Sequence, residues 1–235
     1  PAFGGIMAAK ASPSAVFLAV AAFGIVLCAG VVAALRRGGT AEFRSRAPAQ
    51  TAAWNRSVFY AVLGAFLLMF SQGALAYLLP LRVSEFGLSS SSSGMLLSIF
   101  GVVAVLFFVL PTKRIYDRIS PLRGLQFGML LLGLSQIGLS FAAGSGWLYA
   151  IMLLYGIGFA FIYPSMNMLL IRGTEPGNRG KAYGILYAFF SIGVVAGSSG
   201  LGALPLDIRG MFVATGVLLI AGCLSAFLYR EQPAR

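Results

Sequence analysis

Long apolar segments alternate with short polar ones along the whole chain. A helix rises about 1.5 Å per residue, so 22 residues cover roughly 33 Å, enough to cross a hydrocarbon core of about 30 Å. Seven segments reach such a length or approach it, at 14–35, 57–81, 94–111, 124–143, 147–171, 182–204 and 208–229. Residues 1–9 resemble the end of an earlier helix. The pattern predicts an all-α, polytopic membrane protein with seven full transmembrane helices and a partial one.

The basic residues indicate on which side of the membrane each loop lies. With alternating sides, 14 of the 17 Lys and Arg residues share one side. They lie in 36–56, 112–123, 172–181 and 230–235, while the other side holds Lys10, Arg82 and Arg209. Cytoplasmic loops carry an excess of Lys and Arg. We therefore expect these loops and the C-terminus to be cytoplasmic, in a cell membrane such as a bacterial inner membrane.

The composition agrees with lipid as the solvent and excludes several classes of protein. Hydrophobic residues make up 59% of the chain and charged residues 10%, with a mean hydropathy of +0.90. The net charge of +11 is spread over loops, so we expect no nucleic-acid partner. Cys28 and Cys223 lie in apolar stretches and His is absent, so we expect no metal and no cofactor. No span contains a charged group suited to catalysis, so we expect that the protein is not an enzyme.

The start of the chain indicates a piece of a longer protein. The first residue is Pro1, and no basic segment with a cleavage site precedes an apolar core, as a signal peptide would require. We therefore expect a fragment whose preceding helices are missing.

Polar side chains inside the spans predict a substrate cavity. In 147–171, Tyr149, Gly156, Ala160, Tyr163 and Asn167 share one helical stripe, where small and polar residues alternate. The full set of predicted cavity residues is Tyr60, Ser71, Gln72, Tyr77, Tyr163, Asn167 and Tyr187. The alternative is that such side chains only form hydrogen bonds between helices.

Glycines four residues apart predict close helix packing in two spans. Gly124 and Gly128 lie in one of them, and Gly193 and Gly197 in the other. Glycine lets helix backbones approach closely in lipid, although the same residues could also form a hinge.

Three segments resemble the Major Facilitator Superfamily. Pro1–Gly5 (PAFGG) is similar to the end of the helix-five signature of its antiporters, and Gly73–Pro80 (GALAYLLP) to helix seven of drug-efflux-like members. Residues 156–203 resemble helices ten and eleven. The resemblance implies that 1–35 is the end of helix five and helix six, 36–56 the linker between two bundles, and 57–235 a C-terminal six-helix bundle with a short tail.

The family also has a basic loop motif, of which a weaker copy lies between helices eight and nine. Asp117 and Arg118 fit its D-R pair, while Lys113 and Ser120 replace its glycines. The resemblance implies that Asp117 and Arg118 act in a gating loop. The alternative is that they only anchor the loop in the cytoplasm.

These observations predict a secondary active transporter that works by alternating access, with the missing N-terminal bundle as its other half. The uncharged, aromatic cavity face favours export of hydrophobic or cationic small molecules, and uptake of a small metabolite stays open. A seven-helix receptor is the alternative from another class. If the coupling ion is a proton, we expect its binding group in the missing half, because all six acids here lie in loops or tails.

Overall fold

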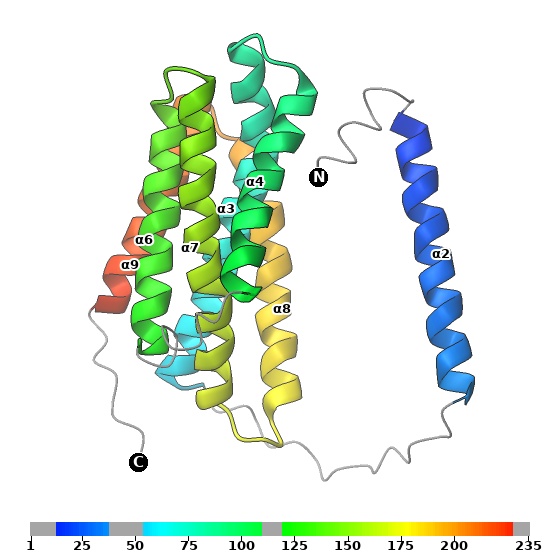
Figure 1. Cartoon of the computed structure of the whole chain (residues 1–235). Helices are drawn as coiled ribbons and strands as arrows, with labels where there is room; N and C mark the ends of the chain where they lie inside the picture. The colour runs from blue at the N-terminus through cyan, green and yellow to red at the C-terminus, as the bar shows by residue number, and fades with distance from the viewer. Residues whose placement is uncertain (1–12, 38–53, 110–118, 228–235) are drawn as a thin grey trace.

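The computed structural model describes residues 13–37, 54–109 and 119–227, and all the regular structure in these ranges is helical. Figure 1 shows the elements along the chain. They are α2 (Pro13–Arg37), α3 (Arg56–Glu85), α4 (Ser90–Val109), α6 (Pro121–Ser140), α7 (Ser145–Arg172), α8 (Arg179–Val195), the π-helix η1 (Ala196–Gly200) and α9 (Ile208–Phe227).

Six of these helical segments are long and apolar enough to cross a membrane: α3, α4, α6, α7, α8 with η1, and α9. In α2, the stretch Ala21–Gly30 counts as a shorter apolar helix. The prediction of an all-helical membrane protein is therefore confirmed. The serine run before the predicted span 94–111 continues that helix, which begins at Ser90. The predicted partial helix at 1–9 lies outside the described residues.

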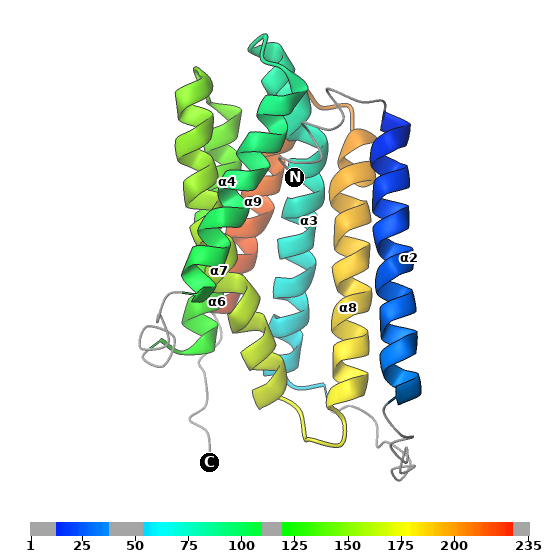
Figure 2. The ribbon, with the colours of Figure 1, turned by 45° about the vertical axis from the view of Figure 1, so that its right-hand side comes forward.

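The helices from α3 to α9 form one bundle, and α3 is its centre. This helix contacts α4, α6, α7, α8 and α9, while α6 packs between α7 and α9. By contrast, α8 packs chiefly on α3 and α4 chiefly on α7. Figures 1 and 2 show the bundle from two directions, and α2 stands apart from it in Figure 1.

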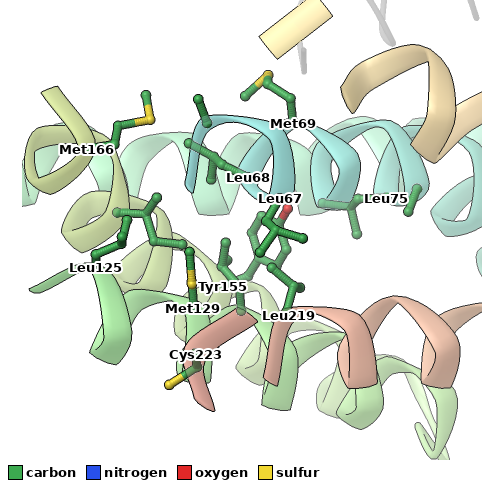
Figure 3. Packing of buried hydrophobic residues seen from close by; sticks show 14 of the residues in the cluster. Leu67, Leu68, Met69, Leu75, Leu125, Met129, Tyr155, Met166, Leu219 and Cys223 are labelled. Atoms are coloured by element: carbon green, nitrogen blue, oxygen red, sulfur yellow. The ribbon is translucent and has the colours of Figure 1, made fainter. Parts of the chain in front are cut away.

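Apolar side chains fill the interior of the bundle. Figure 3 shows Leu67 and Leu75 of α3, Met129 of α6 and Leu219 of α9 gathered around Tyr155 of α7. Tyr155 is the largest of the fully buried side chains. Buried surfaces this continuous exclude lipid from the centre of the bundle, so any polar group there depends on protein partners.

Glycine makes the contact between α3 and α8 close enough for backbone to touch backbone. A Cβ atom on Gly193 would lie 2.5 Å from the Phe66 carbonyl oxygen, and one on Gly197 would overlap the Phe70 carbonyl oxygen. From the other side, a Cβ on Gly73 would overlap the Val194 carbonyl oxygen. The two helices therefore interlock through glycines on both sides, as in other closely packed membrane helices.

Close glycine contacts also join α6 to α7 and to α9. A Cβ on Gly128 would lie 2.8 Å from the Gly158 carbonyl oxygen of α7. A Cβ on Gly216 of α9 would lie 2.7 Å from the Gly133 carbonyl oxygen. The prediction that Gly128, Gly193 and Gly197 mark close helix packing is confirmed; a Cβ on Gly124 would instead overlap the Ser165 side chain.

Polar contacts tie both ends of α3 to other helices. Asn55 caps its first turn, accepting from the Val58 amide at 2.9 Å, and donates to the Gly173 carbonyl oxygen at the end of α7 at 2.6 Å. At the other end, Arg82 is 3% exposed and donates to the Ser140 and Ala142 carbonyl oxygens, at 3.0 Å each. These carbonyls end α6, where the helix dipole favours a cation.

Arg82 has two further partners at this end of the bundle. It forms an ion pair with Glu85, and its guanidinium lies 5.1 Å from the centre of the Phe86 ring. Ser140 in turn donates to the Arg209 carbonyl oxygen at the start of α9, at 3.2 Å. Arg82 thus holds the ends of α3 and α6 together, and Ser140 extends this contact to α9.

The glycine contact predicts that the same substitution has different effects at Gly197 in η1 and at Gly184 in α8. In Gly197→Ala the new methyl group meets the Phe70 backbone, so the helices must separate, and we expect a loss of about 1–3 kcal/mol in unfolding free energy. The matched control is Gly184→Ala, where a Cβ would meet nothing within 4 Å. Unfolding of the full protein in a denaturing detergent titration measures both, and equal stability of the two variants would contradict the packing argument.

The buried guanidinium predicts a second stability effect. Arg82→Gln removes two charge-assisted hydrogen bonds to the end of α6, and we expect it to lower the unfolding free energy by about 2–3 kcal/mol. Arg209→Gln is the control, because Arg209 is exposed and contributes only its backbone carbonyl to this cluster. The same detergent titration compares them, and an equally small effect of both changes would show that Arg82 does not hold the helix ends together.

Candidate functional site

Two of the predicted cavity residues lie together on α7. Tyr163 and Asn167 are both half-buried, and the Asn167 amide donates to the Tyr163 carbonyl oxygen at 2.8 Å, one turn back. The Tyr163 ring stacks on Phe159, with centroids 5.8 Å apart and an angle of 13° between the planes. The side-chain amide of Asn167 is thus used locally, and the rings supply most of the surface here.

These rings belong to a row of aromatic side chains between α4 and α7. Phe100 of α4 meets Phe159 edge-on at 5.7 Å, and Phe108 of α4 lies 6.2 Å from Tyr163. We call the four residues Phe100, Phe108, Phe159 and Tyr163 the aromatic face. Phe108 is 45% exposed and the other three are half-buried, so the row reaches the surface of the bundle. It presents ring faces and edges without a charged group.

A second aromatic group lies on α8. Tyr187 is 51% exposed, its ring stacks on Tyr183 at 6.1 Å, and Phe190 meets it edge-on at 5.8 Å. The Ser191 hydroxyl of the same helix donates to the Tyr187 carbonyl oxygen at 3.0 Å. Because α8 packs chiefly on α3, most of its other surface stays uncovered by the described helices.

Gln72 and Tyr77 of α3 lie on the same helix but in different surroundings. Gln72 is half-buried and precedes Gly73, which touches α8. Tyr77 is 38% exposed, and its hydroxyl would lie 3.3 Å from a Cβ on Gly202, beyond the end of η1. Tyr77 thus lies beside the chain that follows η1.

The structure does not bring Tyr60 and Ser71 to these open surfaces. The Tyr60 hydroxyl donates to the Ser225 carbonyl oxygen of α9 at 2.9 Å, and Ser71 is fully buried. The two residues share one face of α3, as the helical period requires, and α6, α7 and α9 cover that face. Whether any of the seven predicted residues contacts a substrate stays a prediction.

Ser71 belongs to a buried polar cluster that pattern reasoning did not assemble. Its hydroxyl lies 2.9 Å from the Tyr155 hydroxyl of α7 and accepts from the Gln136 amide of α6 at 2.8 Å. All three side chains are fully buried. Gln136 stands mid-span in an apolar helix, which is the sequence signal for such a cluster, since a buried amide requires partners.

The stripe predicted on 147–171 is partly a helix contact. A Cβ on Gly156 would lie 2.8 Å from the Phe100 carbonyl oxygen, so this glycine admits the α4 backbone. Ala160 in the same stripe is fully buried. The interpretation of these small residues as cavity-lining is wrong for Gly156, because glycine in lipid is as well suited to a neighbouring helix as to a cavity.

Three further features concern the predicted gating loop, a small pocket and possible metal ligands. Asp117 and Arg118 lie outside the described residues, as does most of the loop that contains them. A small apolar pocket beside Pro164 is lined in part by Gly124, Phe161 and Met168. Across the ranges that the structure describes, no three His, Cys, Asp or Glu residues stand together as metal ligands would.

Comparison with known proteins places this bundle in a family. The model of the Major Facilitator Superfamily matches residues 1–175 and 61–235. The chain is 25% identical over 178 residues to Multidrug resistance protein 2 of Bacillus subtilis (strain 168), covering 75% of this chain and 42% of that protein. It is 27% identical over 120 residues to the uncharacterized MFS-type transporter YhhS of Salmonella typhi, covering 49% of this chain and 30% of that protein. The chain spans less than half the length of these relatives.

A solved structure shares the fold. It is the crystal structure of a bacterial homologue of the human lysosomal transporter Spinster, in an inward-facing and unoccupied conformation. The TM-score is 0.56 at 18% identity, over 77% of this chain and 45% of that chain. Two overlapping family matches span the chain, and six of its described helical segments are long and apolar enough to cross a membrane. The chain is a multi-pass membrane protein and belongs to the Major Facilitator Superfamily.

Proposed function

We propose that this chain is the C-terminal half of a secondary active transporter that exports hydrophobic or cationic small molecules. The observation that carries the proposal is the aromatic face between α4 and α7, with Tyr187 and its neighbours on α8. Aromatic faces bind apolar molecules by stacking and cations through the ring quadrupole, without a charged partner. Such a surface accepts many ligands of this class and selects little among them.

The proposal also assigns each segment of the chain to a part of the full protein. Residues 57–235 form the C-terminal bundle, 36–56 link it to an N-terminal bundle, and 1–35 are the end of helix five and helix six of that bundle. The substrate site lies between the two bundles, which alternate access to it. The chain's coverage of 45% of the Spinster homologue supports this division.

Among the relatives, support for export comes only from a protein of low sequence identity. One protein that the chain resembles is named for multidrug resistance, at 25% identity. The aromatic face is consistent with that name, since drug-like molecules are mostly apolar and often cationic.

Orientation and coupling complete the proposal. The loops 36–56 and 172–181 and the C-terminus face the cytoplasm, and Asp117 and Arg118 act in a gating loop on that side. The coupling ion is a proton, and its carboxylate lies in the N-terminal bundle, because the acids of this chain are predicted in loops or tails, apart from Glu85, which ends α3 and pairs with Arg82.

Transport by the full protein tests the aromatic face. With ethidium as a fluorescent cationic probe, we expect Tyr163→Ala to raise KM about tenfold, since a desolvated cation–π contact contributes about 1–2 kcal/mol. Tyr163→Phe keeps the ring, so it should stay near the unchanged protein. Phe227→Ala is the control, because Phe227 is 67% exposed at the end of α9, away from this face. Equal KM values for Tyr163→Ala and Phe227→Ala would contradict the proposed site.

Cysteine labelling tests the orientation. Thr51→Cys and Ser145→Cys are made singly in the full protein with its other cysteines replaced, and intact cells are treated with a membrane-impermeant maleimide. We expect Ser145→Cys to react from outside and Thr51→Cys to react only after the membrane is opened, because the basic loops are cytoplasmic. Labelling of both from outside would show that the assigned orientation is wrong.

A further inference from the structure

The buried cluster of Ser71, Gln136 and Tyr155 joins three helices at the centre of the bundle. The Gln136 amide nitrogen lies 3.1 Å from the Ser71 carbonyl oxygen and 2.8 Å from the Ser71 hydroxyl oxygen. The Ser71 and Tyr155 hydroxyl oxygens are 2.9 Å apart. We call these groups the Ser71 cluster. It lies inside the bundle, whereas the aromatic face reaches the surface, so an inference about it does not depend on the transport proposal.

The hydrogen bonds of the Ser71 cluster do not balance. Its two amide N–H groups have the two Ser71 oxygens as acceptors. Of the Ser71 and Tyr155 hydroxyls, one donates to the other, and the second then keeps a proton for which the described residues provide no acceptor. The Gln136 carbonyl oxygen Oε1 is buried and receives no hydrogen bond from the residues the structure describes. One donor and one acceptor thus remain in the same cluster.

Rearranging the protein groups does not satisfy the whole cluster. Turning the Gln136 amide over would let the Ser71 hydroxyl donate to the amide oxygen, but that oxygen would then face the Ser71 carbonyl oxygen, two acceptors at 3.1 Å. Other hydroxyls in the bundle donate to the carbonyl one turn back, as Ser135 does to Leu131 and Thr215 to Met211. The Ser71 hydroxyl makes its contacts across to α6 and α7 instead.

We propose that the Ser71 cluster is a binding site for one water molecule. With Tyr155 donating to Ser71, the water accepts the Ser71 hydroxyl proton and donates to Gln136 Oε1. The amide oxygen lies about 2.3 Å from its nitrogen, so it is within about 5.1 Å of the Ser71 hydroxyl oxygen. Two hydrogen bonds through a water reach about 5.6 Å, so one molecule can satisfy both groups. A buried water needs at least two polar partners, which this site supplies.

Radiolytic footprinting of the full protein in lipid nanodiscs tests the site. A short X-ray pulse generates hydroxyl radicals from water, including bound water, and these oxidise the adjacent aromatic ring. Tyr155 and Phe212 are both fully buried, and only Tyr155 adjoins the proposed water. We expect severalfold faster oxidation of Tyr155 than of Phe212, measured by mass spectrometry. Oxidation of Tyr155 no faster than that of Phe212 would overturn the proposal.

A substitution at Gln136 and a density map of the protein provide two further tests of the water site. Gln136→Met keeps the side-chain length but removes the acceptor, and we expect oxidation of Tyr155 to fall to the rate of Phe212. An unchanged rate in this folded variant would overturn the site. If the variant does not fold, the test is a density map of the unchanged protein at a resolution that shows buried waters. We expect a water within 3.2 Å of Gln136 Oε1 and of one hydroxyl, and a protein donor at that oxygen would overturn the proposal.

Discussion

The close approach of helix backbones at glycine is the contact on which the rest of this bundle depends. In lipid, apolar helices gain little from hiding their side chains from one another, so association rests on dense packing and on polar contacts. Gly73 and Gly197 provide such packing between α3 and α8, as Gly128 and Gly158 do between α6 and α7. A methyl group at any of these positions meets the neighbouring helix, so the helix spacing is determined at these few points.

The candidate site follows from this use of small residues. In α7, Gly158 meets α6, while Gly156 admits the α4 backbone beside Phe159 and Tyr163, whose rings form the aromatic face with α4. In α8 the glycine stripe faces α3, which leaves Tyr187 on an uncovered side. In α8 a stripe of small packing residues thus lies opposite an open aromatic one, and in α7 the close approach of α4 at Gly156 brings the rings of the two helices together.

Sequence patterns predicted well where the helices lie along the chain. They predicted poorly which helices pack against one another. The predicted span 208–229 corresponds to α9, Ile208–Phe227, and 57–81 lies within α3, because length and hydropathy are properties of one segment. The helical period puts Tyr60 and Ser71, which were both predicted as cavity residues, on one face of α3. It does not say which helices cover that face, and here α6, α7 and α9 do. Gly156 shows the same limit, since a small residue suits a cavity and a helix contact equally.

The distribution of polar groups limits what the described bundle can contribute to the proposed transport. The centre of the bundle contains the neutral Ser71 cluster, and among the described residues the one buried charge is Arg82, held by carbonyl oxygens and Glu85 at a helix end. A charge at the centre would cost several kcal/mol without a partner, and the described part of the chain offers none there. The neutral centre that the structure describes therefore offers no carboxylate or histidine that could change its charge during a transport cycle. If the proposed transporter is driven by protons, we therefore expect the protonation change to lie outside the described bundle, which offers aromatic surface instead.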